Sequence, residues 1–125
     1  MNIPEKLKYT KEHEWVKIEG NIATIGITDF AQSELGDIVF IELPNIGDEF
    51  DQMQTFGTIE AVKAVSDMYL PLSGKITEVN ADLDDNPMVI NSDPFGQGWM
   101  VKIEIKKTAE IELLLSPEDY KKILE

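Results

Sequence analysis

One lysine stands out as a residue that could do chemistry, because its neighbours are apolar. Lys63 lies in the middle of Ala61-Val62-Lys63-Ala64-Val65, a single ammonium group among small and β-branched side chains. An exposed lysine has a pKa of about 10.4, so its amine is mostly protonated at neutral pH and is a weak nucleophile. A modifying enzyme would have to remove that proton to acylate the amine. The chain itself has to supply a protruding lysine on a fixed backbone.

The sequence on either side of Lys63 predicts a β-hairpin that would present it. Strand-forming residues precede the lysine at 55–59 and follow it at 68–70, with Gly57 and Gly74 placed where strands bend or backbones pass closely. Hairpin tips are usually built from Asn, Asp or Gly, which adopt turn conformations at low cost. An apolar tip with one lysine is therefore unexpected and suggests recognition by another protein. From the local sequence alone, an ordinary exposed lysine remains the simpler interpretation.

The chain offers little else for catalysis. It has no cysteine, which excludes disulfides, thiolate metal sites and a cysteine nucleophile. Its one histidine, His13, has no evident partner for a zinc site or a nucleophilic triad, so we expect a structural or surface role. The acids of residues 82–93 imitate the spacing of a calcium loop. Pro87, however, stands where that loop needs a glycine with positive φ, so we reject an EF-hand.

Length and composition indicate one compact domain spanning residues 1–125, with a hydrophobic content of 42% that is sufficient for a core. No run of about 18 apolar residues indicates a membrane span, and the N-terminus lacks the apolar core of a signal peptide. We therefore expect a cytoplasmic protein. The 11 basic and 24 acidic residues give a net charge of −13, which disfavours nucleic-acid binding and favours basic protein partners. Solubility explains the same charge equally well.

The remaining sequence predicts a mainly β fold with short helices. Gly20-Asn21 separates two strand-like runs, at 15–18 and 22–25, as in a tight hairpin. Thr28 is expected to cap a helix over residues 29–35 that Gly36 ends in a left-handed turn. Further strands are expected at 37–43, from Ile76 to Val79, and at 99–106, where Trp99, Val101, Ile103 and Ile105 alternate with Met100, Lys102, Glu104 and Lys106. Ser116 and Pro117 predict the start of a C-terminal helix through Tyr120 and Ile123.

The segment around the lysine resembles the lipoyl-lysine signature of the glycine cleavage system H protein family. The matching residues are Glu60-Ala61-Val62-Lys63-Ala64, Ser66-Asp67 and Pro71-Leu72-Ser73-Gly74. The resemblance continues in family order through residues 9–15, 26–44 and 80–99 to a Leu-rich end with Tyr120, so it covers nearly the whole chain. Ala61 departs from the usual serine, and Glu12 stands where a small polar residue is common.

This resemblance implies a lipoyl-domain-like fold, a barrel-sandwich hybrid of two small antiparallel sheets with short helices and a C-terminal helix. It implies that lipoate is attached to Lys63 through an amide, by a lipoate ligase or an octanoyl/lipoyl transferase. Glu60, Val62 and Ala64 would be the recognition residues around the lysine. The loaded arm would fold into a groove near Glu14 and Asp67, where a carboxylate could hold an ammonium group by a charge-assisted hydrogen bond.

By the same resemblance the chain is a carrier and not an enzyme. Glycine decarboxylase, the P protein, would load the aminomethyl group of glycine onto the arm. The tetrahydrofolate-dependent aminomethyltransferase, the T protein, would remove it, and dihydrolipoyl dehydrogenase, the L protein, would reoxidise the dithiol. We expect a monomer, because a shuttle that visits several enzymes should not bury its surface in a permanent dimer.

Three other interpretations stay open at this point. The chain could be another lipoyl carrier, such as the swinging domain of a 2-oxoacid dehydrogenase, although it has strand residues before and a helix after the core and lacks a long linker. It could be an H-like protein that donates lipoate to other lipoyl-dependent complexes. It could also be an acidic binding module in which Lys63 carries nothing.

Overall fold

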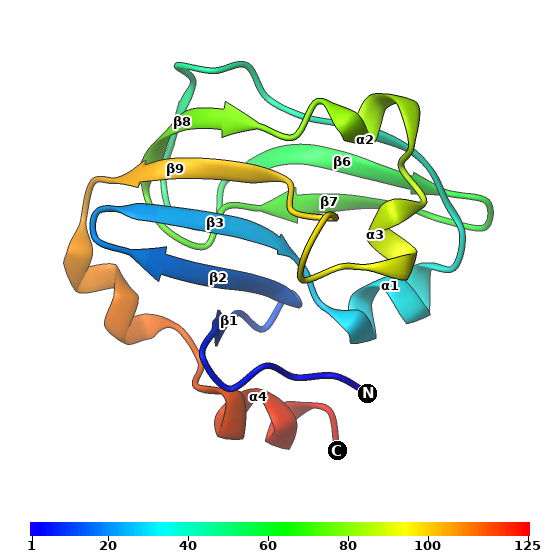
Figure 1. The fold of residues 1–125 in the computed structure, drawn as a ribbon. Coiled ribbons are helices and arrows are strands. Elements are labelled where there is room, and N and C mark those ends of the chain that lie inside the picture. Colours follow the sequence, from blue (N-terminus) through cyan, green and yellow to red (C-terminus); the bar gives the residue numbers. More distant parts are fainter.

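The computed structural model describes residues 1–125 and contains two antiparallel sheets (Figure 1). The larger sheet has the strand order β1-β2-β3-β9-β8-β5, and the smaller has the order β4-β6-β7. The strands are β1 (Lys8–Tyr9), β2 (Glu14–Glu19), β3 (Ile22–Ile27), β4 (Ile38–Glu42), β5 (Glu49–Phe50), β6 (Thr55–Ala61), β7 (Val65–Tyr69), β8 (Gly74–Val79) and β9 (Val101–Ile105). The helices are α1 (Asp29–Leu35), α2 (Asp82–Asp85), α3 (Val89–Ser92), the 3-10 helix η1 (Thr108–Leu113) and α4 (Pro117–Ile123). The predicted fold of two antiparallel sheets with a C-terminal helix is confirmed.

The core lies between the two sheets. Eighteen buried residues form one apolar cluster, to which β3, β8 and β9 contribute from the larger sheet and β4, β6 and β7 from the smaller. A second cluster attaches α4 to the outer edge of the larger sheet and contains Leu7, Tyr9, Trp15 and Tyr120. Within it the rings of Tyr9 and Tyr120 stack with their centroids 4.6 Å apart. Two apolar clusters therefore fix the sheets and the C-terminal helix.

The capping residues in the sequence correctly predicted both ends of α1 and the start of α4. The Thr28 side chain accepts a hydrogen bond from the Ala31 amide at the start of α1, and Gly36 follows the helix with φ +77°. The Ser116 side chain accepts from the Asp119 amide at the start of α4. Each cap satisfies an amide that has no partner inside its helix, and the positive φ suits glycine. These ends were predictable because each depends on residues within one turn.

The expected strand over residues 99–106 is shorter, and its alternation is wrong at Met100. The strand β9 begins at Val101, and Met100 is fully buried instead of lying on the polar face with Lys102. The Met100 amide donates to the Ile25 carbonyl, and the Met100 carbonyl accepts from the Asn80 amide. These irregular backbone bonds turn the Met100 side chain into the core and leave Trp99 half-buried. The two short helices α2 and α3 lie just before this segment and were not predicted.

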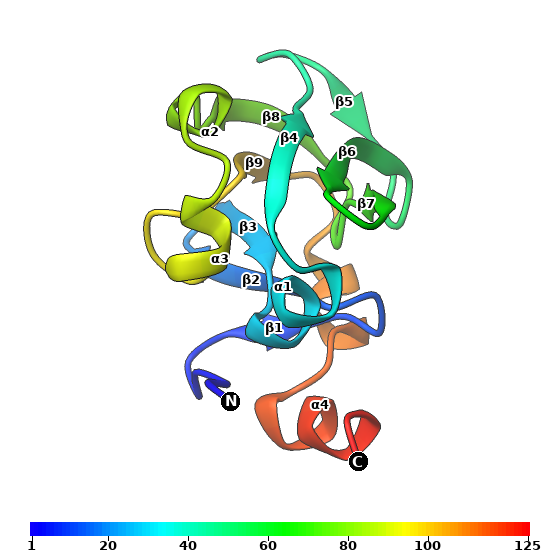
Figure 2. The ribbon, with the colours of Figure 1, turned by 90° about the vertical axis from the view of Figure 1, so that its right-hand side faces the viewer.

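The tip between β6 and β7 lies at the same end of the molecule as α1 and α3 (Figures 1 and 2). The side chain of Asn91 on α3 joins these elements. Its amide nitrogen donates to the Gly36 carbonyl at 2.8 Å, and its amide oxygen accepts from the Ile38 backbone amide at 3.0 Å. The hairpin therefore projects from an end of the fold that is braced by α1 and α3. No helix in the structure combines the length and apolar composition needed to cross a membrane.

Gly57 provides the close backbone approach that the sequence predicted. A Cβ atom at Gly57 would stand 2.3 Å from the Glu42 carbonyl oxygen, and this is a backbone atom that cannot move aside alone. We expect Gly57→Ala to destabilise the fold by on the order of 2 kcal/mol or more, since overpacking forces strands β4 and β6 apart. Thermal unfolding of the variant measures the effect, with Thr58→Ala, on the outward face of the same strand, as the control. Equal melting temperatures for the two variants would contradict this account of the β4–β6 contact.

Candidate functional site

Lys63 lies on a turn whose base is fixed and whose tip is open. The Ala61 amide donates to the Ala64 carbonyl at 2.7 Å, and the Val62 amide donates to the Asp37 carbonyl at 3.0 Å. Val62 is 77% exposed, and Lys63 and Ala64 are also exposed. No residue of the turn has a positive φ, so the turn needs neither Asn nor Gly. This explains how an apolar sequence can form the tip of the hairpin.

The Lys63 side chain has no acidic partner. Its ammonium group forms none of the three ion pairs in the structure. The aliphatic part lies along Gly36, where a Cβ atom would stand 3.3 Å from Cε and 3.9 Å from Nζ. Glycine at the end of α1 therefore leaves room for the lysine, and no contact inside the chain holds the amine back from an acylating enzyme.

Glu60 precedes the tip on the outward face of the smaller sheet. In the strand register it lies between Phe40 of β4 and Val65 of β7. Phe40 is 48% and Val65 68% exposed, so a row of apolar, acidic and apolar side chains crosses the sheet just behind the lysine. Neither apolar member of this row was predicted from the sequence to lie on the surface. A register shift between Ile38 and Phe40 breaks the strict alternation that would have placed Phe40 on the buried face with Ile38.

Glu14 is a buried carboxyl group at the start of β2, with 2% of its surface exposed. Thr10 Oγ1 donates to Glu14 Oε1 at 2.6 Å, and the Tyr69 amide donates to Oε2 at 3.2 Å. Burial raises the pKa of Glu14 to about 7, the two hydrogen bonds oppose this rise, and the neighbouring Glu12 adds to it. Glu14 is therefore a group that changes charge near neutral pH, at the far end of β7 from the lysine.

Asp67 lies on β7 between these two ends. It is exposed, sits opposite Thr58 in the register, and precedes the Glu14-bonded Tyr69 by two residues. The structure thus places Lys63 in the turn, Asp67 within β7 and the Glu14 contact at the end of β7, in that order along the chain. At about 3.3 Å per residue, β7 spans roughly 13 Å from Val65 to Tyr69.

His13 has the structural role expected for it. It adopts φ +68°, its Nδ1 lies 2.9 Å from the Tyr120 hydroxyl, and its ring packs against Phe30 with centroids 4.7 Å apart. The Tyr120 hydroxyl also bonds to the Thr28 hydroxyl at 2.7 Å. Burial lowers the pKa of His13 and raises the pKa of Tyr120, so both are held in their neutral forms. This network fixes the backbone immediately before Glu14.

Comparisons with known proteins point to one family. The family model described as "Glycine cleavage H-protein" matches residues 7–125. The glycine cleavage system H protein of Carboxydothermus hydrogenoformans is 58% identical over 123 residues, which cover 98% of this chain and 95% of the relative. The crystal structure of a glycine cleavage system H protein from Mycobacterium marinum superposes with a TM-score of 0.87 at 34% identity, and covers 98% of each chain. Both likenesses include the hairpin of Lys63 and the strand of Glu14.

Proposed function

Because the chain belongs to the glycine cleavage H-protein family, and so is a lipoyl carrier of glycine cleavage and not itself an enzyme, we propose that Lys63 is the residue that carries lipoate. The observation that carries this proposal is the turn 61–64, which is fixed at its base by two backbone hydrogen bonds and ends in an exposed lysine without an ion-pair partner. Gly36 also leaves the Lys63 side chain uncrowded, because any Cβ atom there would stand 3.3 Å from Lys63 Cε.

The lipoylating enzyme, a lipoate ligase or an octanoyl/lipoyl transferase, would read the surface around the lysine. Val62 and Ala64 flank Lys63 on the open turn, and Glu60 lies behind it between Phe40 and Val65. Small and apolar neighbours allow an enzyme to approach the amine closely and to exclude water from it. Formation of the amide removes the lysine charge, and in this turn that step breaks no ion pair.

When bound, the dithiolane of lipoate supplies the disulfide that accepts the aminomethyl group of glycine. An arm of about eleven bonds from the lysine Cα reaches roughly 14 Å, which is about the length of β7 from the lysine turn to the end that Glu14 contacts. We propose that Asp67 and Glu14 hold the ammonium group of the loaded arm. Ionised Glu14 already accepts two hydrogen bonds and would gain a cation as its third partner. Docking there would withdraw the loaded arm from water between enzymes.

The partners follow from the family's place in glycine cleavage. We propose glycine decarboxylase, aminomethyltransferase and dihydrolipoyl dehydrogenase as the enzymes that the arm visits, with residues 1–125 acting as a single carrier domain. The net charge of −13 suits partners with basic docking faces and would speed their encounter more than it tightens the complexes. A cytoplasmic location and a monomeric state stay predictions.

A loading assay tests the function. The lipoylated chain is incubated with glycine decarboxylase and glycine, and intact mass spectrometry follows the product. We expect the disulfide to gain one aminomethyl group on one sulfur and one hydrogen on the other, with release of carbon dioxide. The aminomethyltransferase with tetrahydrofolate should then remove the aminomethyl group and leave the dithiol, which is two hydrogens heavier than the starting disulfide. Efficient transfer of lipoate from the chain to other lipoyl domains, with no loading from glycine, would instead favour the lipoate-donor function.

A further inference from the structure

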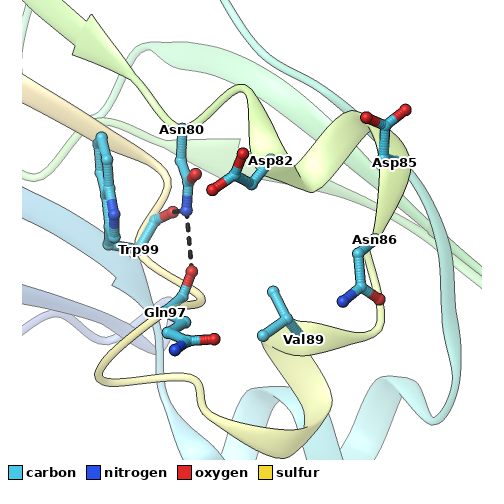
Figure 3. A pocket seen from close by; sticks show the side chains of 7 residues that line it. All are labelled: Asn80, Asp82, Asp85, Asn86, Val89, Gln97 and Trp99. Atoms are coloured by element: carbon cyan, nitrogen blue, oxygen red, sulfur yellow. Dashed lines mark hydrogen bonds between the residues drawn. The ribbon is translucent and has the colours of Figure 1, made fainter.

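An open polar cavity of about 490 Å³, most of whose polar side chains are exposed, has no part in the carrier function described above. The cavity opens between the end of β8, the segment before β9, and helices α2 and α3 (Figure 3). Its polar lining consists of Asn80, Asp82, Asp85, Asn86 and Gln97, and the indole of Trp99 forms one wall. No lysine or arginine lines it, so the cavity contains two carboxylates and no positive charge.

The polar side chains of the cavity are not paired with one another. Asp82 and Asp85 take part in none of the three ion pairs of the structure. The side chains of Asn86 and Gln97 make no hydrogen bond within the chain. All hydrogen bonds of these two residues are made by their backbone atoms. The lining therefore has free hydrogen-bonding capacity, and most of it accepts.

Asn80 gives the cavity a fixed acceptor. It is only 5% exposed, and its amide nitrogen donates to the carbonyls of Gln97 and Trp99, both at 2.8 Å. These two bonds use both hydrogens of the amide and so fix its orientation. Its oxygen accepts no hydrogen bond from the chain and is turned toward the cavity on the side of the Asp82 carboxylate (Figure 3). An accessible acceptor beside a carboxylate suits a positively charged donor.

We propose that this cavity receives the guanidinium group of an arginine from an enzyme of the glycine cleavage system. A guanidinium has five N–H donors in a planar fork, enough to serve two carboxylates and an amide oxygen at once. The Trp99 ring, which already has the Lys102 ammonium 5.4 Å from its centroid, supplies an aromatic wall for the aliphatic and planar parts of the arginine side chain. A divalent metal fits less well, because no three acidic or histidine side chains come together here. The net charge of −13 also favours a basic partner.

The position of the cavity explains how one partner could contact both the cavity and the Lys63 turn. Helix α3, which lines the cavity through Val89, is tied by Asn91 to Gly36 and Ile38. Gly36 is the residue against which Lys63 lies. The cavity and the lysine thus belong to one end of the molecule (Figures 1 and 2). An arginine anchored in the cavity would hold an enzyme where its active site can receive the arm.

The test compares two double variants, each of which removes two negative charges. Asp82→Asn/Asp85→Asn alters the cavity, and Glu112→Gln/Glu118→Gln alters exposed acids near the C-terminus as a matched control. Binding of each to glycine decarboxylase, aminomethyltransferase and dihydrolipoyl dehydrogenase is measured by biolayer interferometry at low and physiological salt. All chains carry Lys63→Arg, so the result does not depend on lipoylation and is separate from a failure of the carrier proposal. Melting temperatures verify that both variants are folded.

We expect the cavity variant to bind at least one of the three enzymes about tenfold more weakly than the control does. In NMR titrations, N-acetylarginine methylamide should shift the Asn80 side-chain amide and the Trp99 indole resonances. The lysine analogue should shift them less, and the cavity variant should not respond. Binding of all three enzymes within about twofold of the control would overturn the proposal. So would equal responses to the arginine and lysine probes.

Discussion

In a Lys63→Arg variant, we expect lipoylation and glycine-dependent turnover to be lost while the fold stays intact. Arginine keeps the positive charge but has no amine that can form the lipoyl amide, and its guanidinium does not lose a proton in proteins. Lys63 is exposed and forms no ion pair, so the free energy of unfolding should change by less than about 0.5 kcal/mol. Turnover in the reconstituted system should fall to background, a loss of roughly a thousandfold or more.

The matched control is Lys121→Arg, an exposed lysine on α4 at another part of the molecule. It should be lipoylated and should support turnover like the unaltered chain. A Lys63→Arg chain that still acquired one lipoyl group would show that a different lysine is the attachment residue. A Lys63→Arg chain that had lost its cooperative thermal transition would show that Lys63 supports the fold.

In a Glu14→Gln variant, we expect the pH dependence of stability to change most between pH 4 and pH 8. The folded chain holds the Glu14 proton up to a pKa of about 7, whereas the unfolded chain releases it near the ordinary value of 4.5. The folded state is therefore favoured at low pH, and this contribution is lost as the pH rises through 7. The shift corresponds to roughly 3 kcal/mol at 1.36 kcal/mol per pKa unit. Relative to the unaltered chain, the variant should gain about that much stability across this range.

The same variant should hold a loaded arm less well. At pH 8 an ionised Glu14 can pair with an ammonium group, and docking would lower its pKa and release the remaining proton. Glutamine cannot supply that charge, so the loaded arm should be lost to hydrolysis about tenfold faster or more. Glu5→Gln, an exposed acid that does not act on the pKa of Glu14, is the control for both measurements. If Glu14→Gln and Glu5→Gln have the same pH profile and the same lifetime of the loaded arm, Glu14 does not hold the ammonium group.

The sequence predicted those parts of the fold that depend on neighbouring residues. The β2–β3 hairpin follows from Gly20, which adopts φ +62°, and the ends of α1 and α4 follow from Thr28 and Ser116. In each of these cases one or two residues decide the local conformation, and the rest of the fold agrees with it. The lysine hairpin was predicted differently, from its two strand-forming arms, because no Asn or Gly marks its turn.

The surroundings of Glu14 could not be predicted in the same way. The residue itself was named from the family resemblance, but the amide of Tyr69, 55 positions further along the chain, is one of its two hydrogen-bond donors. Its burial, and hence the rise in its pKa, depends on how β2 meets the end of β7. No periodicity or spacing in the sequence encodes that contact.

The polar cavity was also beyond the reach of sequence patterns. The acids of residues 82–93 have a spacing that imitates a calcium loop, which Pro87 rules out. The place of Asp82 and Asp85 beside Asn80 and Trp99 depends on the irregular backbone before β9. The error at Met100 has the same origin. Where the chain leaves regular strand geometry, alternation no longer tells which side chain is buried.

The central claim, that Lys63 carries the lipoyl group, is tested most directly by locating the modification. The chain is expressed with lipoate and a lipoate ligase, digested, and sequenced by tandem mass spectrometry beside the Lys63→Arg variant. We predict a single lipoyl group on the peptide that contains Lys63, and none on the variant. An unmodified Lys63 peptide, from a ligase that modifies other H proteins in the same experiment, would contradict the account.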